Sequence, residues 1–280
     1  GLLRLAFQDG SQHLLQRLDP ALQFRVGCGF DFLRHVRAVI VAANPKIHRQ
    51  LKLLDHIYAT PAENLACEEA LLELAETSGG EGVLRFWESP DYFVVVGYSN
   101  KIATEVDVEV CRADGISIYR RCSGGGTVLQ GPGCYNYALV IPAPSENVTE
   151  TNRFIMERNR AAMEKLLGMP VNVQGFTDLT ADGRKFSGNS QRRKRRYVLF
   201  HGTFLYKFDL ALIAKYLRMP SKQPDYRQSR PHTDFVRNIV VTPAAIREAM
   251  LAAWGVTGRM ESLPAIDAAK YNSAEWIWKF

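Results

Sequence analysis

Three consecutive glycines, Gly124–Gly126, restrict the fold of this chain more than any other feature of its sequence. Glycine lacks a Cβ, so the backbone between Ser123 and Thr127 can reach positive φ values and let a ligand lie against its amide groups. Residues 116–118 read as a strand before the glycines, and the apolar, β-prone run Tyr135–Ile141 predicts a strand after them that pairs beside the first. The sequence therefore predicts a loop carried on a sheet, with anion-binding geometry, although a glycine cluster alone is also typical of an ordinary turn.

A second glycine-containing segment makes the interpretation of this loop more specific. Residues 182–191 read Asp-Gly-Arg-Lys-Phe-Ser-Gly-Asn-Ser-Gln, and residues 201–203 read His-Gly-Thr. Together with Arg-Arg-x-Ser-Gly-Gly-Gly at residues 120–126, this combination resembles the lipoate–protein ligase family, over about residues 52–240. The resemblance implies an α+β fold with a mixed or antiparallel sheet and flanking helices, of the class II synthetase-like biotin/lipoate transferase type.

The resemblance also implies a chemistry. Family members join lipoate or octanoate to a specific lysine of an acceptor lipoyl domain or H protein. An amine does not displace a carboxylate oxygen at neutral pH, so ATP with Mg²⁺ would first convert the acid into an acyl-adenylate, whose phosphate needs preorganised donors and cations. The family's catalytic lysine, which lies beside the acyl carboxylate and this phosphate, corresponds to Lys185. The further residues implied to bind substrate or cofactor are Arg121, Ser123, Gly124, Gly125, Gly126, Thr127, Asp178, Ser187, Gly188 and His201.

Two of these residues carry further expectations. Asp178 resembles the second member of an Asn-Asp pair on the adenine and metal side of the family's site, with Thr177 in place of the Asn. A carboxylate at this position is a candidate Mg²⁺ ligand. His201 lies on a predicted strand of alternating character, where a histidine can belong either to the core or to a pocket wall. We therefore expect a structural or a pocket-lining role for His201.

The main rival within the superfamily is an acyltransferase that moves an octanoyl group through a cysteine thioester without ATP. One such group places its cysteine just before a Phe-Asp pair, whereas residues 174–178 read Gln-Gly-Phe-Thr-Asp, which favours the ligase. Against the ligase, its Val-x-His-Asp-x-Gly-Asn pattern is replaced by Val-Leu-Gln-Gly-Pro-Gly-Cys at residues 128–134. Cys134 is therefore the possible nucleophile of the alternative. The same replacements leave open a non-catalytic acyl-binding protein.

Composition limits the partners and the compartment. The net charge of +6 favours an acidic partner, but no nucleic-acid-binding signature is visible, so nucleic acid is not expected. No apolar run approaches the ~20 residues that span a bilayer, and no charged segment followed by an apolar one opens the chain, so we expect a cytoplasmic protein without a membrane partner. The five cysteines are odd in number and lack metal-ligand spacing, which predicts reduced thiols.

The chain divides into three parts. Residues 1–52 lie outside the resemblance and are either an ordered helical extension or sequence upstream of the original start. Residues 53–255 are the expected catalytic domain, and residues 256–280 are a tail that packs on the core through Trp276 and Trp278. Long members of the family carry a C-terminal accessory domain, for which this tail is too short, so a separate accessory subunit is a possible partner.

Periodicity and breakers place the elements within the expected domain. The predicted strands are 83–88, 92–96, 171–173, 176–180, 184–187 and 197–206, and the predicted helices are 61–78, 149–168 with Thr149 as its cap, one after Phe208 that ends at Leu217, and 243–254. The polar segment 219–238 is a candidate mobile lid. The basic run 192–196 predicts a solvated hairpin tip, a docking surface for an acidic acceptor or a nucleic-acid patch.

Overall fold

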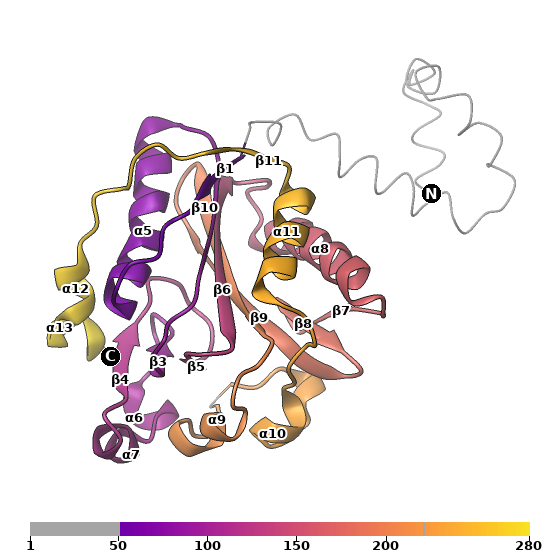
Figure 1. The fold of residues 1–280 in the computed structure, drawn as a ribbon. Coiled ribbons are helices and arrows are strands. Elements are labelled where there is room, and N and C mark those ends of the chain that lie inside the picture. Colours follow the sequence, from indigo (N-terminus) through magenta and orange to yellow (C-terminus); the bar gives the residue numbers. More distant parts are fainter. Residues whose placement is uncertain (1–50, 221) are drawn as a thin grey trace, which may run out of the picture. The chain divides into compact units, whose positions relative to one another are not determined.

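The computed structural model describes residues 51–220 and 222–280, in which helices flank two sheets (Figure 1). In this part of the chain the larger sheet has eight strands in the order β11-β1-β2-β6-β10-β9-β8-β7, and the smaller sheet has three in the order β4-β3-β5. The larger sheet contains parallel pairs, such as β1 with β2, and antiparallel pairs, such as β2 with β6. The expected α+β architecture with a mixed sheet and flanking helices is confirmed.

The elements keep the labels of Figure 1. The larger sheet contains β1 (Leu51–Leu54), β2 (Val83–Trp87), β6 (Cys134–Pro142), β7 (Asn172–Gln174), β8 (Asp178–Ala181), β9 (Arg184–Arg193), β10 (Tyr197–Leu205) and β11 (Val256–Arg259). The smaller sheet contains β3 (Phe93–Val96), β4 (Ser117–Arg120) and β5 (Val128–Gln130). The helices are α5 (Pro61–Ser78), α6 (Ile102–Glu105), α7 (Val108–Ala113), α8 (Val148–Leu167), α9 (Ala211–Tyr216), the 3₁₀ turn η1 (Asp225–Arg227), α10 (His232–Phe235), α11 (Pro243–Trp254), α12 (Ala268–Asn272) and α13 (Ala274–Ile277).

Helix α5 forms as its sequence predicts. Thr60 and Glu63 build a capping box, in which the Thr60 side chain accepts from the Glu63 amide and the Glu63 carboxylate accepts from the Thr60 amide at 2.9 Å. Pro61 occupies the first turn, where its missing N–H costs nothing, and Gly79 ends the helix in the left-handed conformation at φ 68°. The predicted apolar face is buried at Leu65, Leu72 and Ala75.

The larger sheet is buried on both faces where the site is built. Helices α8 and α11 lie on one face and α5 on the other (Figure 1). Along β6, Tyr137 and Leu139 pack into the cluster beneath α8 and α11, whereas Ala138 and Val140 pack into the cluster beneath α5. Each fully buried large apolar side chain contributes about 2 kcal/mol of hydrophobic stabilisation. This burial on both faces explains why β6 reads as a continuous apolar run.

The predicted pairing of the two strands that flank the glycines is wrong. β4 pairs in parallel with β3 in the smaller sheet, while β6 pairs with β2 and β10 in the larger one. Between them the chain forms β5, which was not predicted, and then changes sheets at Gly131 (φ 153°) and Gly133 (φ 85°). A Cβ on Gly133 would lie 2.3 Å from the carbonyl carbon of Lys207, so only glycine allows this close passage. The glycine loop therefore belongs to the smaller sheet and faces the larger one.

Three further predictions need adjustment. Helix α8 is capped by Asn147, not Thr149, because the Asn147 side chain accepts from the Thr149 and Glu150 amides at 2.8 and 3.1 Å. Strand β9 runs on to Arg193 because it pairs along its length with β10. In the tail, Trp276 packs and donates to the Arg120 carbonyl at 2.8 Å, but Trp278 is 50% exposed.

The predicted tail contributes a strand to the larger sheet. β11, from the predicted tail, pairs in parallel with β1. β1 begins at Leu51 and so crosses the expected boundary between residues 52 and 53. The expectations for residues 1–50 lie outside the described residues. No helix within the described ranges has both the length and the apolar character to cross a bilayer.

Candidate functional site

One row of side chains across the larger sheet forms the floor of a pocket of about 930 Å³. Trp87 on β2, Asn136 on β6, Thr203 on β10, Gly188 on β9 and Asp178 on β8 are paired in register across neighbouring strands. Residues directly opposite one another in antiparallel strands point to the same face. All five line the pocket. The glycine loop, the residues after β3 and the segment after α9 form its walls.

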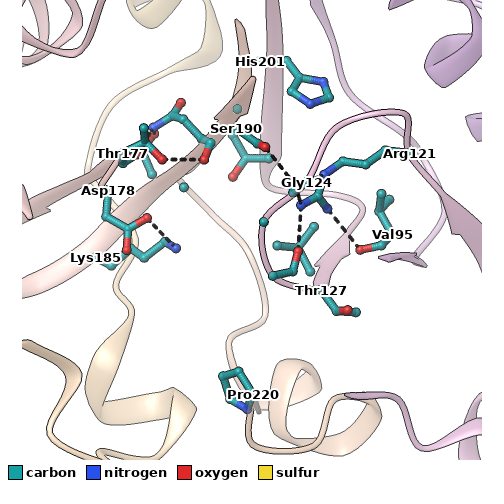
Figure 2. A pocket seen from close by; sticks show the side chains of 18 of the residues that line it. Val95, Arg121, Gly124, Thr127, Thr177, Asp178, Lys185, Ser190, His201 and Pro220 are labelled. Carbon is teal, nitrogen blue, oxygen red and sulfur yellow. Dashed lines mark hydrogen bonds and ion pairs between the residues drawn. The ribbon is translucent and has the colours of Figure 1, made fainter. Parts of the chain in front are cut away.

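Lys185 lies at the β8–β9 end of this floor. Its Nζ is 2.8 Å from Asp178 Oδ1 (Figure 2). Tyr226 donates to Asp178 Oδ2 at 2.7 Å. A Cβ on Gly188 would lie 2.7 Å from Lys185 Nζ, so the glycine leaves the space that the lysine crosses. Burial, followed by the Asp178 charge, raises the pKa of Tyr226, which therefore stays protonated as a donor. Lys185 is thus a partly buried cation held at the floor by a carboxylate.

Asp178 does not fit the expected role of a resident Mg²⁺ ligand. One of its oxygens is occupied by the Lys185 ammonium and the other by the Tyr226 hydroxyl. Mg²⁺ requires several oxygen ligands around it. Within residues 51–220 and 222–280, no group of three His, Cys, Asp or Glu side chains could hold a metal ion. The surroundings of Asp178 therefore do not fit a resident Mg²⁺ ion.

Arg121 organises the glycine loop from inside. Its guanidinium donates to the Gly124 carbonyl at 2.5 Å, to the Gly126 carbonyl at 2.8 Å and to Ser123 Oγ at 3.0 Å. Figure 2 shows Arg121 beside Gly124. Burial lowers the pKa of Arg121 to about 10, so it remains charged at neutral pH. A cation whose donors are taken by the loop's own oxygens positions that loop. These hydrogen bonds favour a role for Arg121 in holding the loop, and the expectation that it binds substrate or cofactor stays a prediction.

The glycine loop lines the pocket. Gly124, Gly125, Gly126 and Thr127 all line it. Gly125 has φ 87°, a conformation that favours glycine. In the described part of the chain no internal acceptor engages the Gly124, Gly125 or Gly126 amides, so these donors can bind an anion.

His201 belongs to a buried hydrogen-bonded chain at the other end of the floor. Its Nδ1 is 2.5 Å from Glu68 Oε2, and its Nε2 is 2.5 Å from Ser123 Oγ. We assign the proton to Nδ1, since the carboxylate only accepts, and Nε2 then accepts from the Ser123 hydroxyl. Trp87 Nε1 donates to the second Glu68 oxygen at 2.8 Å. His201 lines the pocket and also joins α5 to the glycine loop, so both expected roles apply.

Sequence reasoning missed several residues of this site. Glu68 was detectable, because it lies four residues after Asn64 and four before Leu72, on the buried face of α5. A carboxylate on an apolar helix face needs a buried partner. Asn136 and Tyr226 gave no comparable signal. Asn136 sits in a predicted core strand, and Tyr226 lies in a segment without periodicity.

A neutral network supports the floor from beneath. Tyr137 donates to Asn189 Oδ1 at 2.6 Å and accepts from Asn159 at 2.8 Å. Asn189 in turn donates to the Thr177 carbonyl at 2.7 Å and to Ser187 Oγ at 3.2 Å. This network fixes the turn that precedes Asp178. Ser187, expected at the site, is a buried member of it that also lines the pocket.

Cys134 lies behind the pocket. Its side chain is 1% exposed and packs in an apolar cluster with Val94, Leu129 and Leu205. Burial raises the pKa of its thiol to about 12, so it is protonated at neutral pH. A nucleophilic cysteine needs the opposite environment, one that is accessible and favours the thiolate. The four cysteines of the described ranges are free thiols, as predicted.

The basic run contacts mainly other groups of the same chain. Lys194 pairs with Glu73 at 2.6 Å and Arg196 with Glu76 at 3.7 Å, both on α5. Arg193 donates to Thr151 at 3.3 Å, and Arg192 lies over the Tyr98 ring at 5.6 Å. The predicted hairpin tip is confirmed for residues 194–196, while Arg192 and Arg193 are the last residues of β9. These contacts leave fewer cations for a docking surface than the sequence suggested.

The predicted lid segment forms one wall of the pocket. Tyr226 contacts Asp178 as described above, and the Arg237 amide donates to the Lys185 carbonyl at 2.8 Å. Pro220, Lys222 and Phe235 also line the pocket. The segment thus contacts both members of the Lys185–Asp178 pair.

The chain matches the family model described as the lipoyl protein ligase A/B catalytic domain over residues 60–253. It is 32% identical over 162 residues to a protein named probable lipoate–protein ligase A from Mycoplasma pneumoniae, covering 57% of this chain and 46% of that protein. The chain therefore spans about half the length of that relative. It is 26% identical over 270 residues to octanoyltransferase LipM from Carboxydothermus hydrogenoformans, covering 82% of this chain and 98% of that protein.

Two solved structures share the fold. A bipartite lipoate–protein ligase from Thermoplasma acidophilum, described with its lipoyl domain, matches with a TM-score of 0.69 and 21% identity, over 82% of this chain and 97% of that one. A lipoate–protein ligase A bound with ATP matches with a TM-score of 0.65 and 23% identity, over 82% of this chain and 98% of that one. At these identities the likeness establishes the fold.

Proposed function

The chain belongs to the lipoyl protein ligase A/B catalytic-domain family, a family of ligases and octanoyltransferases, and from this premise we propose that it is an ATP-dependent lipoate–protein ligase. It joins lipoate or octanoate, through an acyl-adenylate, to a lysine of an acceptor lipoyl domain or H protein. The observation that carries the proposal is Lys185, a cation at the pocket floor whose only neutralising carboxylate in the described residues is Asp178, 2.8 Å away. The amides of the glycine loop lie in the wall of the same pocket.

The first half-reaction activates the acyl group. A carboxylate oxygen of the acid attacks the α-phosphorus of ATP, and pyrophosphate leaves with the electrons of the broken P–O bond. Lys185 exchanges Asp178 for the incoming carboxylate and phosphate oxygens, and it stabilises the negative charge that develops between them. The Gly124–Gly126 amides supply fixed donors for the same charge. Arg121 contributes indirectly, by holding those amides in place.

The second half-reaction transfers the acyl group. The neutral amine of the acceptor lysine attacks the acyl carbon, AMP leaves with the electrons of the C–O bond, and the amine gives up a proton as the amide forms. The acceptor lysine must therefore enter the pocket that holds the adenylate. Support for such a partner comes from the Thermoplasma acidophilum ligase, which is described with its lipoyl domain and as bipartite. A separate accessory subunit is part of the proposal for the same reason.

The second candidate is an octanoyltransferase, favoured by the full-length match to octanoyltransferase LipM. Transfer through a thioester requires a cysteine at the pocket. The described residues that line the pocket include no cysteine, and Cys134 is buried with a raised pKa. We therefore rank the ligase first. A non-catalytic acyl-binding protein is the third reading, and it predicts binding without turnover.

One experiment separates the three functions. The protein is incubated with lipoate and an unmodified lipoyl domain, with and without Mg-ATP. In a parallel reaction, octanoyl acyl carrier protein replaces lipoate and Mg-ATP, and the lipoyl domain is kept. The ligase modifies the domain only when lipoate and ATP are present. The transferase modifies it from the carrier thioester without ATP. Binding of lipoate without modification in either reaction would contradict both enzymatic functions.

A further inference from the structure

Two exposed apolar side chains stand at the rim of the pocket. Phe176 is 86% exposed and Val148 is 50% exposed, and both line the pocket. We call these two residues the apolar rim. Single exposed apolar residues are common on protein surfaces, but two at the mouth of one pocket suggest that a partner covers them.

The apolar rim is held in place by hydrogen bonds to β9. Next to Phe176, Thr177 donates to the Asn189 carbonyl at 2.6 Å and accepts from the Asn189 amide at 2.7 Å. The Val148 carbonyl accepts from Gln191 at 3.3 Å. Both rim residues therefore flank the same stretch of β9, residues 189–191. The exposure of Phe176 is a property of an anchored turn.

The position of the rim identifies the class of its occupant. A lysine side chain reaches only about 6 Å from its Cα, so an acceptor lysine can enter the pocket only if its backbone lies at the rim. A lysine on a flat surface could not reach the pocket floor. The acceptor lysine must therefore lie on a protruding turn. Lys101 and Lys222, both exposed, line the same pocket and favour acidic groups on the partner.

We propose that Phe176 and Val148 dock the acceptor protein. The partner is a small domain that presents the lysine on a protruding turn, with an apolar side chain to cover Phe176 and acidic groups nearby. This inference rests on the proposed function. It assigns docking to the rim of the pocket and not to the basic run, whose cations contact α5 and neighbouring groups.

The test compares Phe176→Ser with Val240→Ser, a matched control whose residue is 95% exposed and is not among the residues that line the pocket. Each variant is measured with lipoate, Mg-ATP and one of two nucleophiles, an unmodified lipoyl domain or hydroxylamine. Phe176→Ser should raise the KM for the domain about tenfold or more, as for an aromatic interface anchor, and change hydroxamate formation less than twofold. Val240→Ser should change neither, and Phe176→Leu should restore most of the loss.

The other outcomes overturn the proposal. An equal fall with both nucleophiles would make Phe176 part of the acyl site, and no fall with either would remove it from docking. A change of oligomeric state in Phe176→Ser would assign the rim to a second copy of the chain. Calorimetric titration of the unmodified domain into the wild-type protein and each variant measures docking directly, because binding requires no turnover. A wild-type protein that binds the domain through Phe176 but forms no product would refute the proposed function and leave the docking inference standing.

Discussion

The two sides of the pocket use the same type of group, a buried or half-buried cation, in opposite ways. Arg121 gives its donors to the carbonyls and hydroxyl of its own loop. Lys185 meets only a carboxylate of the described chain, which an incoming anion can replace. The difference indicates that a cation in a binding motif acts on the ligand only if the ligand can replace the cation's partners within the protein. We therefore propose that Arg121 is a positioning residue and that Lys185 touches the reacting groups.

The largest expected effect is on the Lys185 side. Lys185→Ala should lower acyl-adenylate formation by about 10²–10³-fold, because it removes the charge that stabilises the transition state in a pocket. Its side chain is 25% exposed, so the melting temperature should change little. Lys165→Ala, at an exposed position of α8, is the matched control. Single-turnover pyrophosphate release measures the effect, and near-normal release by Lys185→Ala would refute the role.

Arg121→Ala should lose stability as well as activity. Several loop oxygens lose their donors, which should cost about 2–4 kcal/mol of unfolding free energy at roughly 1 kcal/mol per bond. Urea denaturation followed by circular dichroism measures this cost. If Arg121→Ala lost activity with unchanged stability, Arg121 would act on the ligand in the same way as Lys185, and the contrast between the two sides would fail.

A smaller effect is expected beneath the floor. Tyr137→Phe removes the hydroxyl between Asn159 and Asn189 and leaves both amides without that partner. The unfolding free energy should fall by about 1–2 kcal/mol. Because Asn189 fixes the turn before Asp178, kcat should fall more than the KM for lipoate rises. An unchanged kcat would show that the network stabilises the fold without positioning the Lys185–Asp178 pair.

The smallest effect is expected at Cys134. With a pKa raised to about 12, its thiol is about 10⁻⁴ ionised at pH 8, and iodoacetamide should not label it in the folded protein. Ionisation and labelling should appear only as the pH approaches 12 or the chain unfolds. Cys134→Ala should keep adenylate-dependent transfer within about twofold, since adenylation needs no protein thiol. Mass spectrometry of the alkylated protein checks the first expectation, and loss of transfer in Cys134→Ala would contradict the second.

Local signals were sufficient for much of the fold. The proline and glycine at the ends of α5 and α11 placed both helices, because caps act within one turn. Of the basic residues 192–196, residues 194–196 form the predicted hairpin turn, whereas Arg192 and Arg193 belong to β9 and pair with β10. The pairing of the strands around the glycine loop was not predictable from local sequence. It depends on whether Gly131 and Gly133 turn the chain within one sheet or lead it into another. The close passage of the Lys207 backbone by Gly133 decides this, and Lys207 is distant in the sequence.

The site shows the same division. Motif resemblance placed Lys185, Gly188 and Asp178 together, and all three line the pocket. It could not show that Arg121 donates its hydrogen bonds to the loop, because a bond to a backbone carbonyl does not depend on which side chain the acceptor residue carries. It also could not find Tyr226, which reaches Asp178 from 48 residues further along the chain. Pairings over such separations follow from the tertiary fold.

The most direct test of the account is the chemical form of the activated acyl group. The protein is mixed with lipoate and Mg-ATP without any acceptor, quenched within one turnover, and analysed by mass spectrometry for small-molecule and protein adducts. We predict one equivalent of lipoyl-AMP per site, its formation by Cys134→Ala as well, and its loss in Lys185→Ala. An acyl adduct on a protein cysteine, formed from octanoyl acyl carrier protein in the absence of ATP, would contradict the account.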